Sequence, residues 1–156
     1  MDTHDVTVGL ISDTHGLVRP EALAALAGSQ LILHAGDIGK PEVLDASRRI
    51  APVVAVRGNV YEGIWAEALP EREIVPVAGL YLYLLHNLKE LNLEPAALGC
   101  AAVISGHSHK PLAEWKDGVL FFNPGSAGPR RFKLPVAVGR LAIDAAGLHA
   151  EILELA

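Results

Sequence analysis

Short apolar runs that end abruptly in polar residues are the repeating pattern of this sequence. In the first third of the chain they cover Val6 to Ile11, Leu31 to His34 and Val53 to Val56. Runs of this length, rich in β-branched residues, are typical of strands buried on both faces. Between them, Pro20 and Pro41 each precede a glutamate and apolar residues at helical spacing, a pattern that favours a helix start. The alternation predicts parallel strands joined by right-handed helical crossovers.

Further along the chain, tight turns replace the helical connections. The pattern predicts strands over Arg72 to Val77, Leu80 to Leu85, Ala102 to Ser105, Leu112 to Lys116, Val119 to Phe122, Val136 to Ile143 and Leu148 to Leu153, with a short helix over Glu94 to Leu98. Asp117-Gly118 is a strong hairpin signal between two of these strands. We therefore expect an α/β fold in which two mixed β-sheets pack as a sandwich flanked by helices.

Composition narrows the class of protein. The chain has 156 residues, 51% hydrophobic and 20% charged, which favours one folded domain over residues 1–156. The net charge of -5, without a basic block, argues against duplex nucleic acid as a partner. Cys100 is the single cysteine, the N-terminus is acidic, and the longest apolar run, Val77 to Leu85, is far shorter than the ~18 residues of a membrane span. We expect a cytoplasmic protein that does not enter a membrane.

Polar residues with metal-ligating side chains follow five of the expected strands. They are Asp13, His15, Asp37, Asn59, His86, His107 and His109. Carboxylate, amide and imidazole donors without thiolates suit manganese, iron or zinc. Seven donors exceed what one tetrahedral zinc takes, but suit two ions that share a bridging carboxylate. Taken singly, each residue is also an ordinary cap, turn residue or buried polar group.

The ordered set of motifs resembles the calcineurin-like metallophosphoesterases. The motifs are Asp13-Thr-His15, Gly36-Asp37, Gly58-Asn59, His86 and Gly106-His-Ser-His109, and the small size and Asn123-Pro-Gly-Ser126 are similar to the small phosphodiesterase branch, which shares its fold with a retromer subunit. The resemblance implies a four-layer sandwich and two divalent ions, with manganese expected and zinc, iron or nickel as alternatives. It implies that Asp13, His15, Asp37 and His109 hold one ion, and that Asp37 bridges to a second held by Asn59, His86 and His107.

This resemblance leads to a hypothesis of phosphoester hydrolysis. Two dications and two aspartates leave about +2, which would acidify a bridging water and attract phosphate, so we expect in-line attack on a small phosphodiester. The expected catalytic residues are Asp37, Asn59 and His86, with Asn59 and Arg130 binding substrate. The alternatives are a protein-binding scaffold of the same fold and a nuclease using the same site. A homodimer or higher oligomer is compatible with the expected sheet edges.

Several positions leave two interpretations open. Many relatives place a histidine after Gly-Asn, whereas Val60-Tyr61 follows here, so esters whose leaving group needs little protonation are favoured. Asn87 stands where relatives have glycine, and asparagine tolerates the left-handed backbone expected there. His34 either orients a ligand or is simply buried. Arg130, with Arg131 and Lys133, either contacts phosphate or belongs to a solvated loop. Tyr61 and Trp65 either line the substrate cleft or cover the core.

Overall fold

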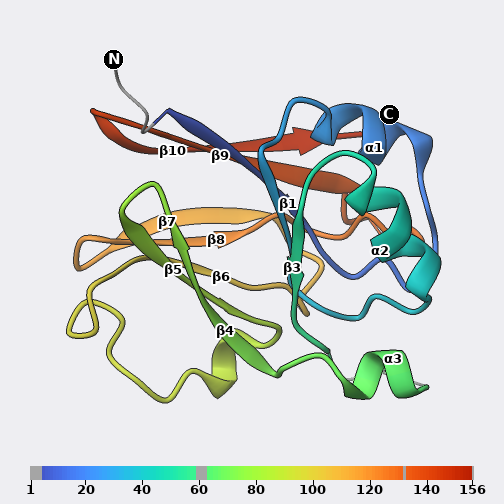
Figure 1. Cartoon of the computed structure of the whole chain (residues 1–156), viewed down its shortest axis with the longest axis horizontal. Coiled ribbons are helices and arrows are strands. Elements are labelled where there is room, and N and C mark those ends of the chain that lie inside the picture. The colour runs from blue at the N-terminus through green and yellow to red at the C-terminus, as the bar shows by residue number, and fades with distance from the viewer. Residues whose placement is uncertain (1–4, 59–62, 132, 156) are drawn as a thin grey trace.

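Two five-stranded sheets packed face to face frame the protein (Figure 1). The computed structural model describes residues 5–58, 63–131 and 133–155. The first sheet has the order β10-β9-β1-β2-β3 and consists of β1 (Val6–Ile11), β2 (Leu31–His34), β3 (Val53–Ala55), β9 (Ala137–Asp144) and β10 (Gly147–Glu154). Strands β1, β2 and β3 pair in parallel, while β9 is antiparallel to both β1 and β10.

The second sheet is also mixed. Its order is β4-β5-β6-β8-β7, and it consists of β4 (Arg72–Val77), β5 (Leu80–Leu85), β6 (Cys100–Ile104), β7 (Leu112–Lys116) and β8 (Val119–Asn123). Strands β5, β6 and β8 pair in parallel, and β4 and β7 run antiparallel at the two edges. The predicted sandwich of two mixed sheets is confirmed, and the predicted strands agree with these bounds to within two residues.

The main core fills the space between the sheets. Leu10 and Leu33 from the first sheet lie in one apolar cluster with Leu84, Ile104 and Phe122 from the second, and all five side chains are almost fully buried. Because side chains alternate along a strand, the inward positions of both sheets carry these residues. The cluster holds the two sheets in a single relative position.

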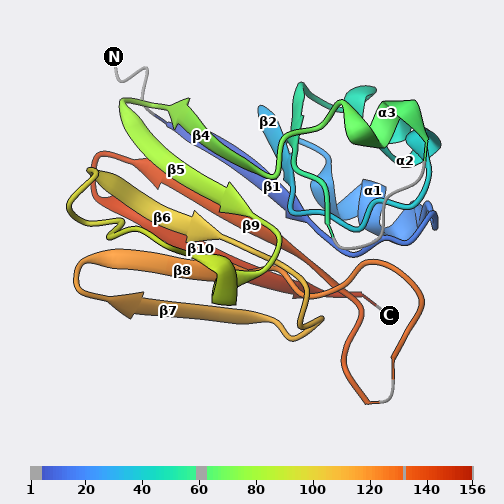
Figure 2. The same cartoon turned by 90° about the horizontal axis from the view of Figure 1, so that it is seen from below.

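Helices cover the outer face of the first sheet. They are α1 (Pro20–Leu26), α2 (Pro41–Arg48) and the short α3 (Ile64–Glu67), which gather on one side of the molecule (Figure 2). Leu26 of α1 packs on Ile32, and Val43 of α2 packs on Ala55 with Trp65 beside it, so Trp65 has the core-covering role. No helix in the described part of the chain is long and apolar enough to cross a membrane.

A loop covers the outer face of the second sheet. Leu91 and Leu93 of this loop pack against Tyr83 and Val103, after a single 3-10 turn, η1 (Leu88–Glu90). The helix predicted over Glu94 to Leu98 is wrong, because the hydrogen bonds of residues 94–100 form turns and no regular helix before β6. In so short a segment, contacts with the rest of the fold decide the local conformation more than helix propensity does.

Adjacent phenylalanines in β8 test the assignment of the two faces. Phe122 is 1% exposed between the sheets, whereas Phe121 is half-buried on the outer face. We expect Phe122→Ala to reduce the free energy of unfolding by ~3–5 kcal/mol through cavity formation. Phe121→Ala should reduce it by only ~1–2 kcal/mol. Urea denaturation of both variants measures the difference, and equal losses would contradict the assigned faces.

Candidate metal centre

The loops that follow four strands meet where the two sheets come together. Asp13 and His15 follow β1, Asp37 follows β2, His86 follows β5, and His107 and His109 follow β6. The carboxyl ends of parallel strands lie at one edge of a sheet, which is where α/β folds place their ligands. Here the edges of both sheets contribute, so residues from positions 13 to 109 of the chain become neighbours.

Backbone hydrogen bonds tie these loops to one another. The Asp13 N–H donates to the carbonyl of Gly36 at 2.9 Å, and the His15 N–H donates to the carbonyl of Asp37 at 2.9 Å, so the pairing of β1 with β2 continues beyond the strands. In the second sheet, the Gly106 N–H donates to the carbonyl of His86 at 2.9 Å. Each sheet therefore positions its own pair of loops.

The Asp13 carboxylate has one anchored oxygen and one that faces the other donors. Its Oδ2 accepts hydrogen bonds from the Ser12 hydroxyl at 2.7 Å and from the His107 N–H at 3.0 Å, and the second bond joins the two sheets. Its Oδ1 is buried and has no hydrogen-bond partner in the described part of the chain. An anchored carboxylate with one free oxygen is suited to metal ligation. The role of Ser12 was not predicted; a Ser-Asp pair at a strand end is the sequence signal for it.

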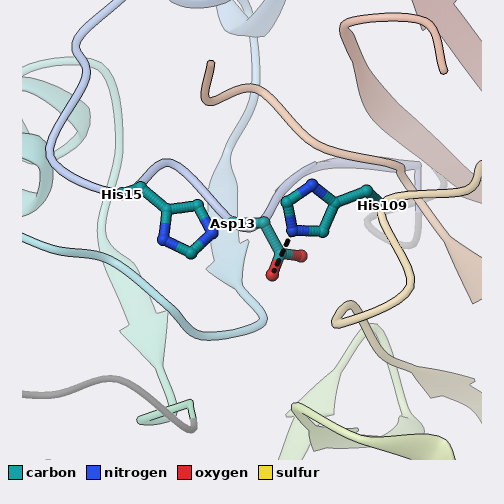
Figure 3. A group of neighbouring side chains, drawn as sticks. All are labelled: Asp13, His15 and His109. Carbon is teal, nitrogen blue, oxygen red and sulfur yellow. Dashed lines mark ion pairs between the residues drawn. The ribbon is translucent and has the colours of Figure 1, made fainter. Parts of the chain in front are cut away.

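One group of donors consists of Asp13, His15 and His109. Figure 3 shows the carboxylate between the two imidazole rings, with His109 Nε2 at 3.4 Å from Asp13 Oδ1. The ring centroids of His15 and His109 are 5.4 Å apart. One ligand atom from each residue lies within 4.8 Å of the others, so all three can contact one ion.

A second group shares Asp13 with the first and adds Asp37 and His86, again with ligand atoms within 4.8 Å of one another. His86 Nε2 lies 3.3 Å from Asp37 Oδ2 and 3.8 Å from Asp13 Oδ1. Asp37 Oδ2 also lies 3.9 Å from His15 Nε2, so both carboxylates stand between the histidines of the two groups. This arrangement offers two adjacent cation positions.

His86 has the tautomer that a metal ligand needs. Its Nδ1–H donates to the carbonyl of Ala35 at 2.7 Å, which leaves Nε2 directed at the carboxylates. Burial opposes a charge on this ring, but the carboxylates of Asp37 and Asp13 outweigh it and raise the pKa of His86. The site therefore favours positive charge beside Nε2, the His86 atom that faces the two carboxylates.

The backbone at the site is locally strained. Asp13, His15, Asp37, His107 and His109 all have positive φ angles, between 48° and 71°. A left-handed conformation costs a non-glycine residue ~1–2 kcal/mol. Such strain persists where the surrounding fold enforces it and often marks functional sites.

His34 braces two of the loops from beneath. It is fully buried and accepts a hydrogen bond at Nδ1 from the Gly36 N–H at 3.1 Å. Its Nε2 is 3.0 Å from the Thr14 hydroxyl, which in turn donates to the carbonyl of Ile38 at 2.8 Å. Burial, with His86 nearby, lowers the pKa of His34 to about 3, so the ring is neutral and holds its loops through hydrogen bonds.

The segment from Asn123 to Ser126 supports the site from the other side. The Asn123 amide donates to the carbonyl of Gly106 at 3.0 Å and to the Ser108 hydroxyl at 3.1 Å. The Ser126 hydroxyl donates to the carbonyl of Asp13 at 3.1 Å. These contacts make the segment a brace for the loops that carry Asp13 and the Gly106-His-Ser-His109 motif.

The remaining predicted site residues lie at the rim or outside the described part. His107 is exposed, and its ring meets that of His86 edge-on at a centroid distance of 5.2 Å. Asn59 and Tyr61 lie outside the described residues. Arg130 is exposed. Burial lowers the pKa of His109. The negative charge of Asp13 opposes this shift, and the positive charge of Arg131 adds to it.

The expectation of a left-handed backbone at Asn87 is wrong. Asn87 has a φ of -112° and a ψ of 112°, and its side-chain oxygen accepts a hydrogen bond from the Lys89 N–H at 3.1 Å. Asparagine at this position therefore starts the η1 turn through its side chain, which is a capping role that glycine cannot supply.

The donor set fits divalent metal ions. Asp13 Oδ1, His15 Nε2, His86 Nε2 and His109 Nδ1 are buried atoms that lack a hydrogen-bond partner among the described residues. Buried polar atoms without partners are unfavourable, and their concentration here indicates that a ligand completes them. Carboxylate and imidazole donors suit manganese, zinc or iron.

Comparison with known proteins identifies the family. The calcineurin-like phosphoesterase superfamily domain matches residues 6–146, which is most of the chain. The chain belongs to this superfamily. Its members bind divalent metal ions, in agreement with the two donor groups.

The chain is similar in sequence to proteins named as phosphoesterases and similar in fold to a sorting protein. The chain is 35% identical to a probable metallophosphoesterase of Methanothermobacter thermautotrophicus, over 94% of the chain and 91% of the relative. It is 27% identical to the phosphodiesterase YfcE of Escherichia coli K12, over 85% of each. The structure of vacuolar protein sorting 29 from Cryptosporidium parvum superposes with a TM-score of 0.76 at 19% identity, covering 97% of this chain and 98% of the other, and shares the fold.

Two glycines with left-handed backbones allow backbone strain to be distinguished from a steric clash with a metal ligand. An added Cβ at Gly36, with a φ of 108°, would meet the His86 ring at 2.7 Å, whereas Gly28, with a φ of 89°, has open space. Gly28→Ala should lose only the ~1–2 kcal/mol of backbone strain. Gly36→Ala should also displace His86 and weaken Mn²⁺ binding roughly tenfold or more. Urea denaturation and calorimetric Mn²⁺ titration measure both effects, and equal Mn²⁺ affinities in the two variants would refute the role of Gly36.

Proposed function

We propose that this protein is a dimetal phosphodiesterase that acts on a small phosphoester. The observation that carries the proposal is the pair of donor groups that meet at Asp13. Asp37 Oδ2 lies 3.9 Å from His15 Nε2 and 3.3 Å from His86 Nε2, one histidine of each group, which supports Asp37 as the ligand shared by the two ions. We assign Asp13, His15, Asp37 and His109 to the first ion, and Asp37, His86, His107 and Asn59 to the second. Manganese is the ion we expect, and zinc or iron suits the same donors.

The ions, when bound, supply an acidified water and positive charge for the phosphoryl group, which supports in-line attack at phosphorus. The contribution of the chain is to hold its donors in fixed positions. The Ser12 hydroxyl and the His107 N–H prevent Asp13 from turning, and the carbonyl of Ala35 keeps the proton of His86 on Nδ1. Because the donors are held before substrate arrives, little reorganisation is required during the reaction.

Residues at the rim would contact the substrate. His107 is exposed beside the buried donors, and Arg131 is close enough to His109 to affect its charge. A guanidinium in this position can donate to phosphate oxygens, so we place Arg131, with Arg130 beside it, on the substrate side. Val60-Tyr61 follows Asn59, where many relatives have histidine, and this favours substrates with a good leaving group, such as aryl diesters.

A protein-binding scaffold is the second candidate function, because the similar structure of vacuolar protein sorting 29 has the same fold. The two candidates differ in what the donors do. A scaffold needs no metal-dependent hydrolysis of an ester, whereas the proposed enzyme requires it.

Metal-dependent turnover is the direct test. Metal-free protein should hydrolyse bis(4-nitrophenyl) phosphate only after Mn²⁺, Zn²⁺ or Mg²⁺ is added, and faster than it hydrolyses 4-nitrophenyl phosphate. Mass spectrometric metal analysis should find two ions per chain. Stoichiometric metal without turnover of either ester would favour the scaffold.

Asp37 provides the mutational test. Asp37→Ala should reduce kcat/KM roughly a thousandfold or more, because it removes the carboxylate assigned to both ions. It should also reduce the bound metal. Asp45→Ala is the matched control, since Asp45 is exposed on α2 and pairs with Arg48 at 3.5 Å. A variant lacking Asp37 that retains full turnover would exclude the proposed site.

A further inference from the structure

An apolar cleft lies beside the candidate metal centre. It has a volume of about 750 Å³, and its walls are residues 87–89, 105–108, 110–112 and 121–123. Clefts of roughly 300–1,000 Å³ hold small organic ligands. A second cleft on the His86 side is smaller, about 290 Å³, and is lined by Arg57, Glu71, Arg72 and Glu90. The two clefts differ in chemistry, and only the first is apolar.

Large apolar side chains line the larger cleft. Phe121 points to the outer face of the second sheet, opposite to its neighbour Phe122 in the core. Leu112, at the start of the edge strand β7, is 47% exposed, and Leu88 in η1 is 36% exposed. Exposed apolar side chains that gather around one cleft often mark a binding site, whereas single exposed apolar residues do not.

The wall of this cleft is also part of the metal centre. The loop from Ser105 to Ser108 lines the cleft and carries His107, whose N–H donates to Asp13 Oδ2 at 3.0 Å. The ring of His107 contacts that of His86, at a centroid distance of 5.2 Å. A phosphoryl group at the donors would therefore be adjacent to the entrance of the cleft, and a substituent on phosphorus could enter it.

The charges around the cleft suit an anionic ester. Lys89 and Lys110 belong to its lining, and no carboxylate does among the described residues. In the smaller cleft, Glu71 pairs with Arg57 at 2.8 Å, so positive charge there is already compensated. Of these two clefts, the larger one alone would offer a phosphoester with an apolar substituent both cations and an apolar wall.

We propose that this cleft is the subsite for the organic group of the substrate, and that the group is an aromatic ring or an apolar group of similar size attached directly to the phosphate. The inference rests on the proposed phosphoesterase function and adds to it the class of ester. Esters with small alkyl groups would leave the cleft empty and bind less tightly.

Two phosphonates test the subsite without turnover. The metal-loaded protein is titrated calorimetrically with phenylphosphonate and with methylphosphonate, at a pH where both are dianions. Phenylphosphonate should bind about tenfold or more tightly, because only its ring enters the apolar cleft. Hydrolysis of bis(4-nitrophenyl) phosphate is measured on the same protein to verify the function separately.

Matched variants locate the effect. In Leu88→Gln/Leu112→Gln the preference for phenylphosphonate should fall to within about twofold. Leu98→Gln, a change of a 54% exposed leucine outside the cleft lining, should retain it. Both variants alter exposed side chains, and urea denaturation verifies that they fold.

The outcomes separate the two proposals. Equal binding of the two phosphonates, or a preference that persists in the double variant, would overturn the subsite while hydrolysis of the diester leaves the enzyme proposal standing. Absence of both hydrolysis and phosphonate binding in the metal-loaded protein would instead remove the function on which the subsite depends.

Discussion

Two buried carboxylates held close together are the constraint that organises this protein. Asp13 is 0% exposed and Asp37 is 6% exposed, and their oxygens lie within 4.8 Å of each other and of His86. At such a separation and a typical effective dielectric, like charges repel by about 3 kcal/mol. The arrangement is favourable only with positive charge beside it. The surrounding histidines and the raised pKa of His86 indicate that the site is built to receive cations.

The sandwich makes this placement rigid. Backbone hydrogen bonds join the loop after β1 to the loop after β2, and the loop after β5 to the loop after β6. The hydrogen bonds from His107 to Asp13 and from His86 to Ala35 connect the two sheets. The core around Phe122 fixes the distance between the sheets. The loop that carries His107 also lines the apolar cleft, so one segment serves both the centre and the proposed subsite.

Most of the fold could be predicted from apolar runs and turn signals, because long strands have strong patterns. Short helical elements could not: α3 and η1 were not predicted, and the helix over Glu94 to Leu98 was wrong, because so few residues show no helical periodicity. The convergence of Asp13, His15, Asp37, His86 and His109 follows from their places at strand ends. The sharing of Asp13 by both donor groups depends on how the two sheets pack, and chain order contains no signal for it.

The left-handed backbones of the donor residues have an evolutionary consequence. Glycine adopts a φ near 60° without penalty, whereas His107 and His109 hold 71° and 63° at a cost in stability. A descendant released from metal chemistry would gain stability by accepting glycine or asparagine at these positions. Histidine at these positions therefore costs stability that only ligand binding can justify, and a relative with glycine at both of them is expected to have lost the ion.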